Sequence, residues 1–192
     1  MTGAHNVESE RIIVMGIGNP LMHDEGVGVR VIETLMSDFA FADNVELIDA
    51  GTMGMGILNL FQRCDYMLVV DAIDGTGEPA GTVVSLSPED LAPNQVLHSL
   101  HDLRLVDVLQ AAELIGTTPK VECVGVQIAD MTEVGIGLTP QVEQAVPDAV
   151  EAVLSFLARR GVRAEPAERD LPEDVRIVRN VPGRDPSPTE DL

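Results

Sequence analysis

Apolar residues follow two alternating patterns along the chain. Short runs rich in Val, Ile and Leu, bounded by glycine or polar turns, are typical of buried strands; they fall at residues 12–15, 45–49, 66–71, 81–86 and 121–127. Apolar residues spaced every three or four positions are typical of helices; they fall at residues 24–39, before residue 63, and at 101–115 and 140–160. Strands alternating with helices predict an α/β protein, a three-layer α/β/α sandwich with a mostly parallel, twisted sheet of about five strands. We expect residues 81–86 to pair beside residues 66–71 as an antiparallel edge strand.

The first strand ends in a glycine turn that differs from a dinucleotide-binding turn. The G-x-G-x-x-G pattern would need a third glycine where this chain has Leu21. The predicted helix then opens with Asp24 and Glu25, whose negative charges already complement the positive end of the helix dipole. A phosphate placed there would meet like charge, so the turn is better suited to a cation than to a nucleotide.

Two glycines in the first turn of that helix also need an explanation. Gly26 and Gly28 each cost roughly 1 kcal/mol relative to alanine in a helix. Their presence predicts that another backbone comes very close there, either a packed strand or a bound peptide.

Composition restricts the function classes. The 192-residue chain has a formal net charge of −20, which argues against nucleic acid and anionic membranes as partners. No apolar run is long enough to span a membrane, and the polar, acidic residues 1–10 do not form a signal peptide. Cys64 and Cys123 have no metal-site spacing, and we interpret both as reduced core residues of a cytoplasmic protein.

The helical and strand patterns end before the C-terminus. Residues 1–164 are predicted to form one α/β domain, and residues 165–192 a tail rich in proline and acidic residues that is extended or disordered.

Three residues that can bind a metal are predicted to lie at one edge of the sheet. Glu25 follows the first strand, Asp71 ends the third, and His101 opens the helix after the fourth. In a mostly parallel sheet, ligands bind beyond the carboxyl ends of the strands, so these side chains can converge. Two carboxylates and an imidazole suit a divalent transition metal. Purely structural interpretations remain open: Asp24 as an N-cap, Glu25 as a dipole partner, Asp71 as a strand-end residue and His101 as a helix-start residue.

Several motifs, in order, resemble those of the [NiFe]-hydrogenase maturation proteases. They are the segment from Gly16 to Gly28, the Asp49-Ala-Gly-Thr turn, the 68–73 strand, the histidine-bearing segment 99–109, and the 135–140 stretch Gly-Ile-Gly-Leu-Thr-Pro. The second motif departs from the family pattern, which is usually Asp-Gly-Gly-Thr, because alanine replaces one glycine.

The resemblance implies an endopeptidase that removes the C-terminal extension of the [NiFe]-hydrogenase large subunit precursor after nickel insertion. The family's metal-contacting acid, acid and histidine correspond to Glu25, Asp71 and His101, and Asp24 matches a further acid with a supporting catalytic role. Nickel, supplied by the large subunit, is the expected metal, although other divalent transition metals fit the same ligands. The tail would contribute to the choice of large subunit.

Two other hypotheses remain open from the sequence. One is a non-hydrolytic nickel-binding chaperone for the large subunit that uses the same three ligands. The other is a nucleotide-binding module built on Gly16 and Gly18.

Overall fold

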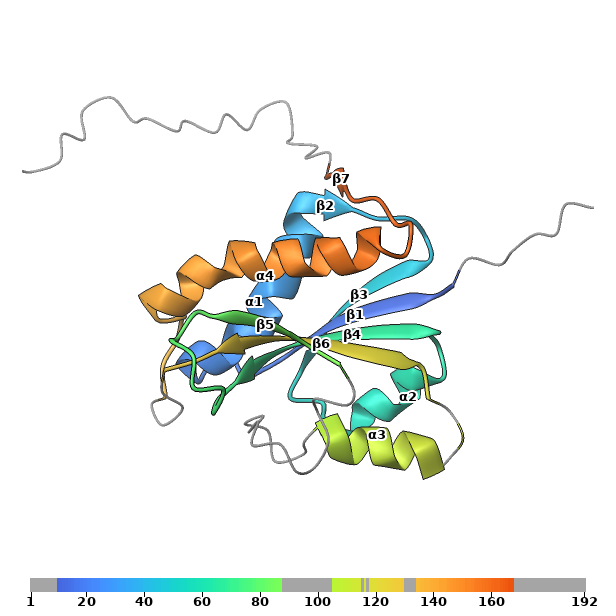
Figure 1. The fold of residues 1–192 in the computed structure, drawn as a ribbon, viewed down its shortest axis with the longest axis horizontal. Helices are drawn as coiled ribbons and strands as arrows, with labels where there is room; N and C mark the ends of the chain where they lie inside the picture. Colours follow the sequence, from blue (N-terminus) through green and yellow to red (C-terminus); the bar gives the residue numbers. More distant parts are fainter. Residues whose placement is uncertain (1–9, 88–104, 115, 117, 130–133, 168–192) are drawn as a thin grey trace, which may run out of the picture.

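The computed structural model describes residues 10–87, 105–114, 116, 118–129 and 134–167. Its centre is a five-stranded sheet with the strand order β3-β1-β4-β6-β5 (Figure 1). The strands are β1 (Ile12–Ile17), β3 (Val45–Gly51), β4 (Tyr66–Ile73), β5 (Val83–Leu86) and β6 (Lys120–Gln127). All neighbouring pairs are parallel except β5 with β6. The predicted mostly parallel sheet is therefore confirmed, with β5 as its antiparallel edge.

Helices cover both faces of this sheet and complete the predicted three layers (Figure 1). One face carries α1 (Val27–Asp38) and α4 (Pro140–Ala158), which also pack against each other. The other face carries the short turn η2 (Gly54–Ile57) with α2 (Leu58–Phe61), and α3 (Leu105–Leu114). A two-stranded antiparallel sheet, β2 (Phe39–Ala40) with β7 (Glu165–Pro166), lies at the C-terminal end of α1.

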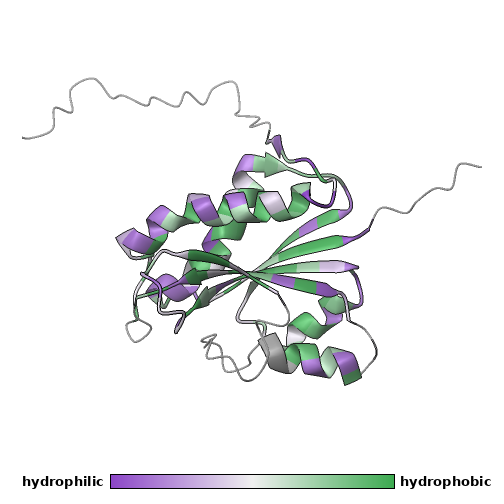
Figure 2. Ribbon diagram, in the orientation of Figure 1, coloured by the Kyte–Doolittle hydropathy of each residue, from purple (hydrophilic) through white to green (hydrophobic). Residues whose placement is uncertain are grey.

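The alternation of side chains along β4 divides the core between the two faces. Leu68 and Val70 belong to the cluster under α1 and α4, whereas Met67 and Val69 belong to the cluster under α2 and α3. The strands are accordingly coloured mostly hydrophobic in Figure 2. Because side chains in a strand alternate between faces, Asp71 falls on the α2 and α3 side with Met67 and Val69.

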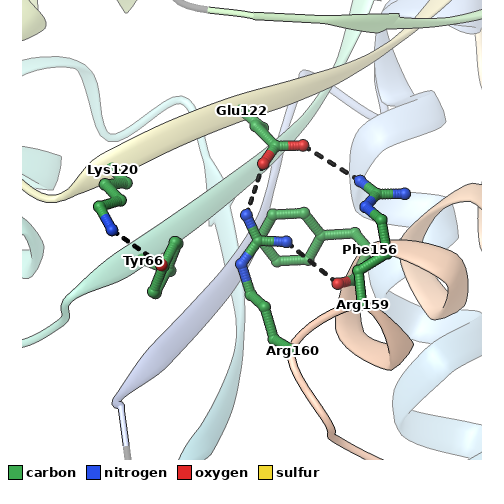
Figure 3. A network of polar contacts seen from close by, with 6 residues as sticks. All are labelled: Tyr66, Lys120, Glu122, Phe156, Arg159 and Arg160. Atoms are coloured by element: carbon green, nitrogen blue, oxygen red, sulfur yellow. Dashed lines mark hydrogen bonds and ion pairs between the residues drawn. The ribbon is translucent and has the colours of Figure 1, made fainter.

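A polar network holds the end of α4 against the amino-terminal ends of the strands (Figure 3). Glu122 of β6 accepts hydrogen bonds from Arg159 at 3.2 Å and Arg160 at 2.5 Å. The Arg160 guanidinium carbon lies 3.7 Å from the Phe156 ring centre and 4.4 Å from that of Tyr66. Cation–π contact and charge pairing together fix the C-terminal end of α4 on the sheet.

Three local expectations differ from the structure. The helix expected from Asp24 begins with a 3-10 turn, η1 (His23–Gly26), before α1 starts at Val27. The edge strand β5 pairs with β6 and not with β4, because β6 occupies the position between them. The first two residues of the expected tail, Glu165 and Pro166, pair with β2 as β7. The tail beyond residue 167 lies outside the described residues.

The expectation that both cysteines are reduced core residues holds. Cys64 and Cys123 are both free and buried. Among the described residues, no helix is both long and apolar enough to cross a membrane.

Candidate active site

The turn after β1 brings the start of α1 into direct contact with two strands. A Cβ atom on Gly28 would lie 2.2 Å from the carbonyl oxygen of Ile17 in β1 and 2.4 Å from that of Val70 in β4. No side chain fits there. The close backbone approach predicted from the two glycines is therefore confirmed at Gly28, and its source is the packed strands.

This contact places Glu25 beside β4 at the carboxyl edge of the sheet. Glu25 lies in η1, three residues before Gly28, and η1 packs against β4. Asp71 directly follows Val70 in that strand and lies opposite Gly125 of β6. Both carboxylates are buried, with Glu25 5% exposed and Asp71 4% exposed. The structure thus brings the two predicted acids to one edge and removes both from bulk water.

The pKa of the Cys123 thiol indicates on which side of the sheet the negative charge of Asp71 acts. Burial, and secondarily the negative charge of Asp71, raises the pKa of the Cys123 thiol far above its usual range. Cys123 belongs to the core cluster under α2 and α3. The electrostatic influence of Asp71 therefore reaches the same side as α3.

His101 lies outside the described residues. Of its two nearest substitutes as a ligand, His98 also lies outside them, whereas His23 lies in η1. α3 begins four residues after His101, at Leu105. Because the chain passes from α3 into the amino end of β6, the start of α3 lies toward the carboxyl edge that carries Asp71. His101 as the third ligand stays a prediction.

The predicted ligands are of chemical types that bind divalent transition metals. Two buried carboxylates on adjoining elements supply oxygen ligands, and an imidazole from the segment before α3 would supply nitrogen. Within the described part of the chain, no three His, Cys, Asp or Glu residues form a group able to hold a metal ion. Metal binding therefore also stays a prediction.

Asp24 has a partner that the sequence reasoning missed. Its Oδ1 accepts a hydrogen bond from the backbone N–H of Thr139 at 2.7 Å, and its Oδ2 accepts one from the Thr139 hydroxyl at 3.0 Å. Asp24 is fully buried and does not cap η1 or α1. It instead places a negative charge at the N-terminus of α4, where the helix dipole is positive. Thr139 is the N-cap residue of α4, but its hydroxyl bonds Asp24 and not its own helix.

Hydrogen bonds between His23 and residues 135–137 also stabilise the turn that carries Asp24 and Glu25. His23 has a backbone φ of +47°, which is uncommon outside glycine. Its backbone N–H donates to the Gly135 carbonyl at 2.8 Å, and its Nδ1 lies 3.1 Å from the Gly137 carbonyl. A Cβ on Gly135 would lie 2.0 Å from His23 Nε2. The only sequence signal for this contact was the 135–140 motif, which carried no indication of its partner.

The fold is a three-layer α/β sandwich with two buried acids at the carboxyl edge of its sheet. Comparison with known proteins identifies the family. A family model described as hydrogenase maturation protease matches residues 29–156. The hydrogenase 2 maturation protease of Escherichia coli K12 is 41% identical over 162 residues, covering 82% of this chain and 97% of the relative. The chain belongs to the hydrogenase maturation proteases.

Further relatives and solved structures support the same family. The hydrogenase expression/formation protein HupD of Bradyrhizobium diazoefficiens is 34% identical over 90% of this chain and 91% of its own. The structure of the hydrogenase-maturating endopeptidase HybD from E. coli matches with a TM-score of 0.73 and 41% identity, covering 81% of this chain and 97% of that one. These comparisons confirm the predicted family and fold, and they give no support to the chaperone hypothesis.

Proposed function

We propose that this protein is the endopeptidase that removes the C-terminal extension of a [NiFe]-hydrogenase large subunit precursor once nickel has been inserted. The observation that carries the proposal is the burial of Glu25 and Asp71 at one sheet edge in a chain of this family. Glu25, Asp71 and His101 would contact the precursor's nickel, or another divalent transition metal. Such a metal polarises a peptide carbonyl or lowers the pKa of bound water.

The residues of this site would act mainly by placing negative charge where water is excluded. Buried carboxylates interact with a cation more strongly than exposed ones, because the local dielectric constant is lower. Asp71 would also serve as the general base that takes a proton from the attacking water. Asp24 would support the site through Thr139, by fixing the turn from which Glu25 projects.

A weak resident metal site is consistent with this function. Three ligands without a cysteine thiolate leave coordination positions open and hold a metal loosely. A site of this kind would be completed by a metal that the substrate carries, and cleavage would then report that nickel has been inserted. The residues beyond 167 would help to select the large subunit.

We place the reaction in the cytoplasm, because two buried free thiols suit a reducing compartment. Nucleic acid is not a partner under this proposal, since a net charge of −20 repels phosphate backbones.

Incubation of purified protein with nickel-loaded precursor, followed by mass spectrometry of the large subunit, tests the proposal. An endopeptidase shortens the subunit by the mass of its C-terminal extension. A nickel chaperone would leave the mass unchanged and alter only the metal content.

A further inference from the structure

Three large apolar side chains beside the candidate active site are exposed to solvent. Leu21 is 60% exposed, Val134 82% and Ile136 85%. We call these three residues the apolar rim. Most other large apolar side chains of the described residues are buried in the two core clusters. Of the seven exposed large apolar side chains among the described residues, these three lie on two segments that are bonded to each other, and this clustering calls for an explanation.

Backbone hydrogen bonds hold the rim residues next to one another. The Gly135 N–H donates to the Leu21 carbonyl at 3.0 Å, and Met22 and Gly135 form a parallel β-bridge. Leu21 thus lies in a turn directly before one bridged residue, with Val134 and Ile136 on either side of the other. The bonds of His23 to Gly135 and of Asp24 to Thr139 brace the same pair of segments. The rim is a fixed surface, because both of its segments are tied at several points.

The rim adjoins the turn that carries Glu25. Leu21 precedes Glu25 by four residues, and the Glu25 N–H donates to the Met22 carbonyl at 3.2 Å. A polypeptide whose scissile bond reaches Glu25 along this turn would pass close to Leu21 and the segment bonded to it. The rim lies where the residues flanking that bond would lie.

The charge pattern indicates the chemistry of the occupant. The chain has 12 Lys and Arg and 32 Asp and Glu residues, yet residues 17–23 and 134–140 contain none of them. An uncharged apolar strip on so acidic a protein repels neither an apolar segment nor a basic one. Only an apolar segment gains free energy from burying apolar surface when it covers the strip. The centre of a protein interface has this composition, apolar and depleted in charge.

We propose that the apolar rim binds apolar side chains of the precursor segment that carries the scissile peptide bond. This assignment rests on the proposed function. Each rim side chain would lose its contact with water when the precursor binds. The apolar area buried in this way would contribute to affinity without taking part in bond cleavage. The rim would therefore determine substrate binding, and the acids would determine the rate of the chemical step.

The test compares substitutions in the rim with a matched substitution far from it. Val134→Ser and Ile136→Ser, singly and together, remove apolar surface from the rim. Leu114→Ser does the same at the C-terminal end of α3, where Leu114 is 88% exposed and lies toward the amino edge of the sheet. The full-length proteins are compared by thermal melting, by their Kd for nickel-loaded precursor and by cleavage kinetics.

Each rim substitution is expected to raise the Kd and KM for the precursor about tenfold, with kcat within about twofold of wild type. The Leu114→Ser protein is expected to match the wild type. Wild-type Kd and KM in the double rim variant would overturn the rim assignment while leaving the proposed function intact. A wild-type protein that binds the precursor through the rim but never cuts it would overturn the proposed function alone.

Self-association is the competing occupant of the rim. Sedimentation of the wild-type protein and of the double variant distinguishes it from substrate binding. A wild-type dimer that the rim substitutions convert to a monomer, without a change in precursor affinity, would show that a second copy covers the rim and would overturn the proposal.

Discussion

Both carboxylate oxygens of Asp24 are bonded to one residue, Thr139, which lies 115 positions further along the chain. The bond joins the turn that carries Glu25 to the first residues of α4. It connects the candidate active site to one of the longest elements of the fold, and it makes the position of the turn depend on α4.

Replacing Asp24 with alanine is expected to destabilise the protein. The Thr139 N–H, in a partly buried contact, would lose its acceptor, and leaving a buried donor unsatisfied costs up to roughly 1–3 kcal/mol. Asp24→Asn, which keeps an oxygen that can accept this bond, is expected to lose less. Urea denaturation measures both effects, with Asp148→Ala on the exposed side of α4 as the control. Equal stability of the wild-type and Asp24→Ala proteins would show that the bond contributes nothing.

Gly28→Ala is expected to be among the most damaging single substitutions in the chain. The added methyl group would collide with two backbone carbonyls, and neither can move without shifting β1 or β4. Overpacking of this kind costs about 3 kcal/mol or more. Gly56→Ala is the matched control, because its Cβ would meet only the side chain of Met53, at 3.5 Å and beyond. Thermal melting of the two variants should separate them clearly, and similar melting temperatures would contradict the packing argument.

Alkaline pH is expected to destabilise the fold through Cys64. Burial, and then the charge of Asp65, raises the pKa of the Cys64 thiol from its ordinary value of 9.0 to about 11. Between these two values the unfolded chain loses the thiol proton and the folded chain retains it, so the free energy of unfolding falls as pH rises. The contribution is fully present below pH 9 and is lost by about pH 11.

Melting temperatures from pH 8 to 11 would show this decrease. Cys64→Ala, which has no thiol to ionise, serves as the comparison and should show a shallower decrease over the same range. Parallel curves for the two proteins would mean that Cys64 does not contribute to the alkaline loss.

Removal of nickel from the precursor is expected to prevent cleavage. Under the proposed function, Glu25, Asp71 and His101 leave a coordination site that only the metal of the substrate completes. The measurement is the mass of the large subunit after incubation of metal-free precursor with the protein, with nickel-loaded precursor as the positive control. Efficient cutting of folded, metal-free precursor would show that this protein does not check for nickel.

The sheet and its acidic edge were predictable because their signals are local. Buried parallel strands need continuous apolar runs, so Tyr66–Ile73 stood out, and Asp71 stood out as the charged residue in its last part. The partners of Asp24 and His23 were not predictable, because their bonds reach segments more than 100 residues away. Side-chain periodicity carries no information about such pairings. The same limit explains why β5 was expected beside β4, its neighbour in sequence, and not beside β6.

The proposed cleavage requires Glu25 and Asp71 to act together on the precursor. The most direct measurement is the rate at which folded wild-type, Glu25→Gln and Asp71→Asn proteins shorten nickel-loaded precursor, followed by mass spectrometry. Glu143→Gln, in the exposed first turn of α4, is the control and should cut at the wild-type rate. Both site variants are expected to keep their fold and to lose activity by at least about 100-fold. A folded Glu25→Gln or Asp71→Asn protein that cuts at the wild-type rate would contradict this requirement.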